Sequence, residues 1–216
     1  FAATGTELNN TAVILDEAAV SKSWCEAECM FPKITIIDPE IAAGAPYRLS
    51  NWGCMDILSH TFEFYFNGRA DALFQQRFSE ALILSAMECV ELLQKDPRDL
   101  RARGELAWIS VAAWGGQTKI GRGAPDMACH TCAEGLVPYF DIHHGAALGV
   151  ITPRWMRWAA PKRPAVFARF ARNVMGVAEA DDERAAREGV ERYVAWLKKV
   201  GAPDTFEELA GQKIPE

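Results

Sequence analysis

The chain has 216 residues, 50% of them apolar, and a formal net charge of -6. A chain of this length and apolar content can bury one large hydrophobic core or two smaller ones, so we expect a globular protein. Its lysines and arginines are scattered and outnumbered by acidic residues, which argues against nucleic acid or an anionic membrane as a partner. No apolar run reaches the roughly 18 residues that a membrane-spanning helix needs, and the cytoplasm is the expected location.

Six cysteines are spread along the chain, at positions 25, 29, 54, 89, 129 and 132. Because a core of this size needs no covalent cross-links, we expect free thiols. The sequence opens with Phe1 and runs directly into AATGTELNN, which leads us to expect a piece of a longer protein.

Short β-rich runs mark the first 40 residues, and helical patterns follow. TAVILD (11–16) and KITIID (33–38) predict two strands with a loop between them, the second ended by Pro39. Apolar residues at spacings of three and four then predict helices over 51–66, 70–93, 98–114, 125–138, 145–159, 163–176 and 181–199. The predicted fold class is mainly α, an all-helical body preceded by a short β segment.

One aspartate and three histidines are placed where they can share a metal ion. Asp56 and His60 are four residues apart on a predicted helix, so their side chains project from one face. His130 lies inside a later helix and His144 starts the next one. If the two segments face each other, the set suits Fe(II), Zn(II), Mn(II), Co(II) or Ni(II), whereas calcium prefers oxygen ligands. The alternative is a group of ordinary, partly buried histidines, each bonded to a backbone carbonyl.

Five stretches, taken in order, resemble the iron-containing (group III) alcohol dehydrogenases, most closely the butanol dehydrogenase-like branch. They are ATGTE (3–7), AVILD (12–16), IIDP (36–39), MDILSHTFEFY (55–65) and the pair His130 and His144 followed by GAALGVITP. The resemblance implies a two-domain enzyme. Residues 1–40 would complete its nucleotide-binding domain, and residues 41–216 would form its helical metal-binding domain.

The resemblance also implies which residues act. The metal ligands fall on Asp56, His60, His130 and His144, which would hold Fe2+ or Zn2+. Thr4, Val13 and Lys22 fall where the family binds the nicotinamide of NAD(P)H. The implied reaction is hydride transfer between this cofactor and a small alcohol or aldehyde, with the metal acting as a Lewis acid on the substrate oxygen. Members of the family are often homo-oligomers, and we expect the same here.

Three features depart from the family pattern or lie beside it. Glu134 stands one helical turn after His130, where the branch commonly has another histidine; its carboxylate can add a ligand, alter proton handling and substrate choice, or reduce activity. No GxGxxG or Walker-type stretch for a pyrophosphate occurs, so we expect no appreciable dehydrogenase activity from this chain alone. His143 is a spare histidine, which either orients its neighbour or is simply exposed.

Three other functions are compatible with the residues. Cys129 and Cys132 could join Cys25 and Cys29 in a structural zinc site, although the first pair falls within a predicted helix instead of a knuckle turn. A metal-dependent hydrolase could use the same Asp and His ligands with a bound hydroxide. The third is a non-catalytic helical domain with a decayed site, against which the complete ligand set argues.

Overall fold

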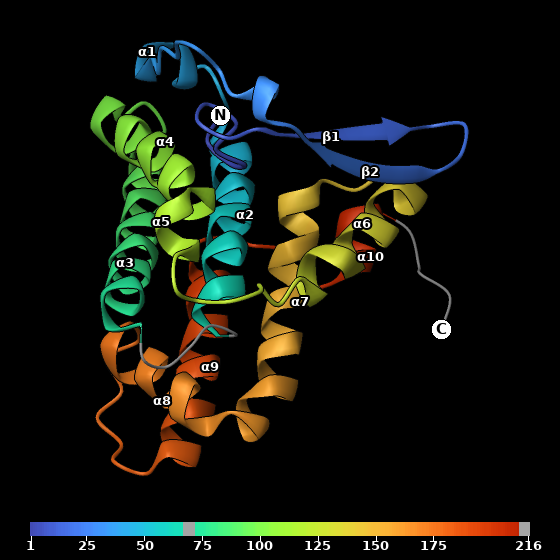
Figure 1. The fold of residues 1–216 in the computed structure, drawn as a ribbon. Coiled ribbons are helices and arrows are strands. Elements are labelled where there is room, and N and C mark those ends of the chain that lie inside the picture. The colour runs from blue at the N-terminus through green and yellow to red at the C-terminus, as the bar shows by residue number, and fades with distance from the viewer. Residues whose placement is uncertain (67–71, 212–216) are drawn as a thin grey trace.

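The computed structural model describes residues 1–66 and 72–211. Its elements are β1 (Thr11–Asp16), β2 (Ser21–Glu26), η1 (Glu28–Met30), α1 (Pro39–Ala42), α2 (Tyr47–Tyr65), α3 (Leu73–Lys95), α4 (Leu100–Trp114), α5 (Gly116–Lys119), α6 (Ala128–Phe140), α7 (His144–Ala159), η2 (Ala160–Lys162), α8 (Pro164–Asn173), α9 (Asp182–Lys199) and α10 (Phe206–Ala210). The mainly α fold class is confirmed. Figure 1 shows a body of helices from which the β1–β2 hairpin extends as an arm beside α6.

Helix α2 is the central helix of this body because it is apolar on nearly every side. It begins directly after Pro46, and every residue from Gly53 to Tyr65 is buried. It packs against α3, α4 and α7. The few polar residues of this helix therefore lie in the protein interior, where each one needs a partner.

Besides a small group between α8 and α9, two groups of buried side chains hold the described helices together. The larger group joins α2, α3, α4, α8 and α9 and includes Phe66 stacked on Phe167, with ring centroids 4.1 Å apart. The smaller group lies between α6 and α7, where Cys129 and Leu148 are buried and α10 covers one side. Since α7 also packs on α2, the second group fixes α6 in relation to the central helix.

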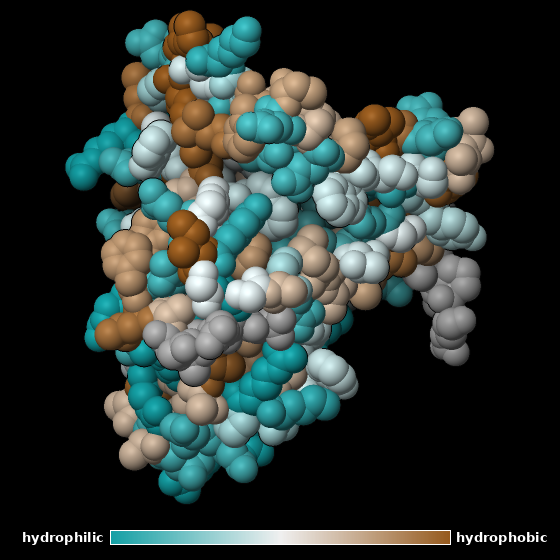
Figure 2. All heavy atoms as spheres, viewed as in Figure 1, coloured by the Kyte–Doolittle hydropathy of each residue, from teal (hydrophilic) through white to brown (hydrophobic). Residues whose placement is uncertain are grey.

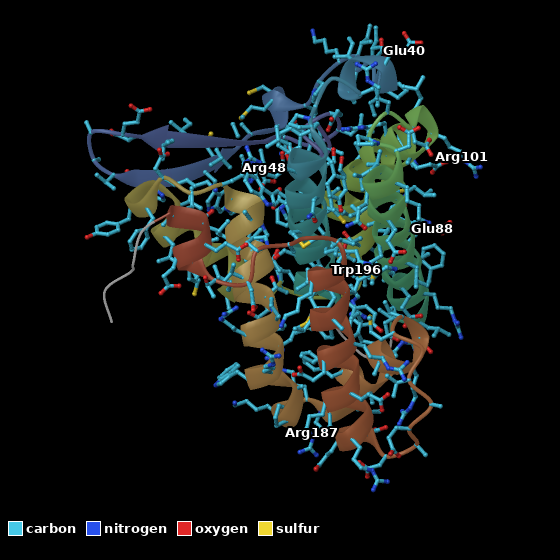
Figure 3. The ribbon with its side chains drawn as sticks, turned by 180° about the vertical axis from the view of Figure 1, so that it is seen from behind. Glu40, Arg48, Glu88, Arg101, Arg187 and Trp196 are labelled. Carbon is cyan, nitrogen blue, oxygen red and sulfur yellow. The ribbon has the colours of Figure 1, made fainter. Side chains whose placement is uncertain are left out.

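Side-chain caps and surface charges define where several helices begin and which faces remain in water. Asp99, Asp181 and Thr205 each accept a hydrogen bond from the backbone N–H three residues later, at the starts of α4, α9 and α10. Seen from behind, Glu88 and Arg101 lie at the outer edge of α3 and α4 (Figure 3). None of the helices in residues 1–66 and 72–211 combines the length and hydrophobicity that a bilayer crossing requires.

The predicted strand at 33–38 is wrong. The second strand is SKSWCE (21–26), which pairs antiparallel with β1, and residues 33–38 have no regular structure. Ile34 and Ile36 are each 86% exposed. A strand needs a neighbouring strand to bond its backbone, and the only sheet in the described residues is the hairpin itself.

All seven predicted helices are present, with ends that differ by a few residues. Helix α2 begins at Tyr47 instead of residue 51, and α8 ends at Asn173 instead of residue 176. The predicted start of the second helix, at residue 70, lies outside the described residues, and α3 begins at Leu73. The sequence prediction missed α1, α5 and α10, which have at most five residues each and are too short to show a helical period.

Candidate metal centre

One carboxylate oxygen, Oδ1 of Asp56, lies close to three histidines that come from three helices. Helix α2 provides Asp56 and His60, α6 provides His130 near its start, and His144 is the first residue of α7. The Oδ1 atom is 3.6 Å from His60 Nε2, 3.4 Å from His130 Nε2 and 3.7 Å from His144 Nε2. The structure therefore brings together all four residues that spacing and resemblance singled out.

These distances suit a shared metal ion. A tetrahedral ion with bonds of about 2.0–2.2 Å separates its ligand atoms by roughly 3.3–3.6 Å. Asp56, His130 and His144 each offer one ligand atom, and these atoms all lie within 4.8 Å of one another. His60 is not one of these three residues, but its Nε2 lies 3.6 Å from Asp56 Oδ1. Three of the four residues form a compact donor set, and His60 borders it.

The unsatisfied polar atoms of the cluster also fit a cation. Asp56 is 2% exposed, and its Oδ1 makes no hydrogen bond of normal geometry, only the longer contacts with the three imidazoles. His130 Nε2, which faces this oxygen, makes no such hydrogen bond either. Burying a polar atom without a partner is costly, and a carboxylate oxygen and an imidazole nitrogen directed at one point are the donors that Fe2+ and Zn2+ accept.

Burial and mutual charge set the protonation of the metal-free site. Burial alone would raise the pKa of Asp56, but the neighbouring imidazoles hold it well below its usual range. Burial lowers the pKa of His60 to about 4 and that of His144 to about 3. Burial would also lower the pKa of His130, but the carboxylates of Asp56 and Glu63 raise it to about 10. At neutral pH the site therefore holds an ionised aspartate, two neutral imidazoles and one imidazolium.

Gly145 lets α7 come close enough to α2 to deliver His144. A Cβ atom at this position would lie 2.0 Å from the carbonyl oxygen of Trp52 and 3.6 Å from the Cβ of Asp56. Only a glycine fits between the two backbones. Because Gly145 directly follows His144, this close approach sets the distance between His144 and Asp56.

Glu63 is a member of the site that the sequence analysis did not single out. Its Oε1 lies 2.5 Å from His130 Nδ1, on the side of the ring opposite Asp56, and the residue is 3% exposed. A signal was present in the sequence, because Asp56, His60 and Glu63 follow at i, i+4 and i+7. Residues at that spacing share one face of a helix.

A cavity of about 670 Å3 opens beside the histidines. His60 and His130 form part of its wall, Thr4 and Val13 line it from the N-terminal segment, and Glu134 lines it from α6. Aromatic rings close other parts of the wall, namely those of Trp24, Phe64 and Trp114. The volume and the mixture of apolar and polar walls are typical of sites for small organic ligands.

Two further residues from the sequence analysis lie next to the donor cluster. Lys22 is not part of the cavity wall; its Nζ is 3.2 Å from His144 Nδ1. Burial lowers the pKa of Lys22, although the charges of Glu134 and Asp56 oppose this. The ring of His143 is half-buried, tilted against Trp52 with centroids 4.9 Å apart, and lies outside the donor cluster.

The cysteines do not assemble into a zinc site. All six thiols are free, and Cys25, Cys29 and Cys132 are exposed while Cys129 is buried. Within residues 1–66 and 72–211, the one group able to hold a metal consists of an aspartate and two histidines. The structure therefore gives no support to a thiolate site.

The part of the sequence that carries this cluster matches a known protein family. Residues 51–213 match the profile of the Fe-containing alcohol dehydrogenase family, C-terminal. The chain belongs to the iron-containing alcohol dehydrogenase family. The matched segment contains the four residues of the cluster, so the resemblance of the sequence motifs to this family is confirmed.

Relatives within the iron-containing family include enzymes described as acting on alcohols or aldehydes. The chain is 31% identical over 207 residues to a probable NADH-dependent butanol dehydrogenase 1 of Bacillus subtilis (strain 168), covering 94% of the chain and 53% of that protein. It is 26% identical over 216 residues to the NADPH-dependent aldehyde reductase YqhD of Escherichia coli (strain K12), covering 99% of the chain and 55% of that protein. The chain thus spans about half the length of the curated relatives it matches.

The fold is shared with a solved butanol dehydrogenase of the same family. The crystal structure of NADH-dependent butanol dehydrogenase A from Thermotoga maritima matches 99% of the chain with a TM-score of 0.93 and 36% identity. The match covers 53% of that protein. The iron-containing family and the butanol dehydrogenase-like fold are therefore supported both by sequence and by structure.

Proposed function

We propose that this chain is the metal-binding part of an NAD(P)H-dependent alcohol dehydrogenase or aldehyde reductase. The observation that carries the proposal is the position of Asp56 Oδ1, which lies 3.4–3.7 Å from the Nε2 atoms of three histidines. The proposed ligands are Asp56, His60, His130 and His144, and the proposed ion is Fe2+ or Zn2+. Thiolates are absent from the cluster, which fits iron as well as zinc.

The residues around the ligands would prepare a substrate for hydride transfer. A divalent ion held there supplies Lewis acidity that stabilises negative charge on a substrate oxygen. His60 and His144 are neutral at physiological pH and are therefore ready to donate their lone pairs. The rings of Phe64 and Trp114 give the neighbouring cavity apolar walls, and electrostatic interactions are stronger beside such walls than in open water.

We propose that Thr4, Val13 and Lys22 lie at the nicotinamide of the cofactor. Thr4 and Val13 line the same cavity as two of the histidines, which supports a nicotinamide ring in that space. The amine of Lys22 lies beside His144, and from this side of the cluster it would contact the cofactor. Glu134 also lines the cavity, and we propose that its carboxylate influences substrate choice there instead of binding the ion.

The division of the chain at residue 40 is supported by its exposed apolar surface. Ile34 and Ile36 are each 86% exposed and Ile41 is 79% exposed. Figure 2 shows hydrophobic residues gathered around α1 at the end of the molecule that carries this segment. We propose that a nucleotide-binding domain covers residues 1–40 in the whole protein and bonds the backbone of 33–38, and that without it the chain has no appreciable activity.

Metal content tests the first half of this proposal. We expect about one Fe or Zn ion per chain by elemental analysis, lost when His130 and His144 are both replaced with alanine. His143→Ala is the matched control, because its ring lies in the same segment but outside the donor cluster. A folded wild-type protein without metal would refute the metal centre, and so would equal metal content in the double variant.

Nicotinamide-dependent turnover tests the second half. The whole protein, including a nucleotide-binding domain, is expected to reduce a short aldehyde with NADH or NADPH, and removal of the metal by a chelator should abolish this activity. Turnover of an ester or amide without nicotinamide would favour the hydrolase alternative instead. Reduction of an aldehyde by residues 1–216 alone would refute the need for a further domain.

A further inference from the structure

The carboxylate of Glu63 has no role in the ligand set, yet it is buried against one of the proposed ligands. Glu63 lies on α2, three residues after His60, and its Oε1 is 2.5 Å from His130 Nδ1. Its other oxygen, Oε2, is buried without a hydrogen-bond partner in the described structure. A buried carboxylate in such a place is costly unless it serves the group that it touches.

We infer that Glu63 is a positioning residue for the metal centre, acting through His130; this inference rests on the proposed metal site. A carboxylate accepts hydrogen bonds and donates none when ionised, so it holds the imidazole proton on Nδ1. The lone pair of a neutral His130 then resides on Nε2, the atom that faces Asp56 at 3.4 Å. Glu63 thereby selects the tautomer that can bind the ion.

Other contacts keep the His130 ring in the same orientation. The ring stacks on that of His60 with centroids 4.7 Å apart and planes inclined by 12°. The backbone carbonyl of Glu63 accepts the N–H of Asp126 at 3.1 Å, which ties α2 to the segment just before α6. The side chain of Glu63 thus orients the ring of His130, and its backbone carbonyl holds the segment that leads into α6.

The other two histidines have no such carboxylate. His60 Nδ1 is buried without a hydrogen-bond partner, and His144 Nδ1 faces the amine of Lys22. Among the described residues, His130 is therefore the histidine whose tautomer is fixed by a carboxylate. Together, Asp56 and Glu63 also supply two negative charges, which would offset those of a buried divalent ion.

The test is the zinc affinity of the purified protein, measured by competition with a chromophoric chelator. Glu63→Gln keeps the size of the side chain but can either accept or donate, so it no longer dictates the tautomer. We expect zinc affinity to fall by about 10- to 100-fold. Glu80→Gln is the control, because Glu80 is also a buried carboxylate but bonds Tyr65 and Arg169, away from the cluster. It should change zinc affinity by no more than about twofold.

Each result separates the role of Glu63 from the existence of the site. Unchanged zinc affinity in Glu63→Gln, or an equal loss in Glu80→Gln, would overturn the inference while leaving the metal centre intact. No zinc binding by the wild-type protein would instead refute the centre itself. If Glu63→Gln fails to fold, nitrogen NMR of the zinc-loaded wild-type protein decides: a proton on His130 Nδ1 is expected, and a metal-bound Nδ1 would overturn the inference.

Discussion

The close approach of α7 to α2 at Gly145 gives the sharpest prediction for the metal centre. In Gly145→Ala the new methyl group would begin 2.0 Å from the carbonyl oxygen of Trp52, about 1.4 Å short of the 3.4 Å at which ordinary contact starts. Neither atom belongs to a flexible side chain, so α7 must move. His144 Nε2 starts 3.7 Å from Asp56 Oδ1, and the same movement would open this distance to as much as about 5 Å.

A displacement of this size exceeds what a metal site tolerates. Ligand distances at such sites are held within about 0.2 Å, so we expect Gly145→Ala to lose His144 as a ligand and to weaken zinc binding by about 10- to 100-fold. Forcing a methyl group between packed helices should also cost about 1–3 kcal/mol of stability. Chelator competition measures the first effect and urea unfolding the second.

Gly149→Ala is the matched control, one helical turn later on the same helix. Its Cβ would lie 3.3 Å from the Cγ of Met55, a flexible side chain that can shift by a few tenths of an ångström. Alanine is also the better helix former, so this variant should be neutral or slightly more stable and should bind zinc normally. If Gly145→Ala binds zinc as tightly as Gly149→Ala, the argument from close approach is refuted.

Three more predictions concern protons and the exposed segment. The folded-state pKa values of His60 and His144, about 4 and about 3, lie below the roughly 6.5 of an unfolded chain, so the metal-free protein should lose stability as the pH falls from about 6.5. Urea unfolding at several pH values should show a smaller acid loss in a His60→Gln and His144→Gln double variant; an identical loss would contradict the assignment. Because the pKa of His130 is raised to about 10 in the metal-free protein, zinc binding near neutral pH should release about one proton and strengthen as the pH rises; calorimetry in buffers of different ionisation enthalpy measures this, and pH-independent binding would contradict it. Replacing both Ile34 and Ile36 with aspartate should leave the unfolding midpoint of residues 1–216 unchanged, because both side chains are exposed, but lower that of a longer protein in which they are covered; no change in the longer protein would count against the proposed domain contact.

The longer helices were readable from sequence because their apolar residues either recur at helical spacing or, in α2, follow one another almost without interruption. The nearly continuous apolar run of α2 predicted a buried helix, and Asp56 and His60 were correctly placed on one of its faces. The strand at 33–38 was predicted from composition alone, and composition does not state whether a pairing partner is present. For the same reason, SKSWCE was missed: it is mostly exposed and polar, and it becomes a strand only by pairing with β1.

Sequence alone determined which candidate ligands are available, because the Asp56 and His60 spacing and the motifs around His130 and His144 point to one carboxylate and three imidazoles. Only the tertiary structure decided that they meet. Their convergence depends on α6 and α7 packing over α2, on a glycine small enough to let α7 approach, and on Glu63 reaching across to His130. Spacing along a chain fixes neighbours on one helix, but the distance between helices is set by side-chain volume and packing, which local patterns do not encode.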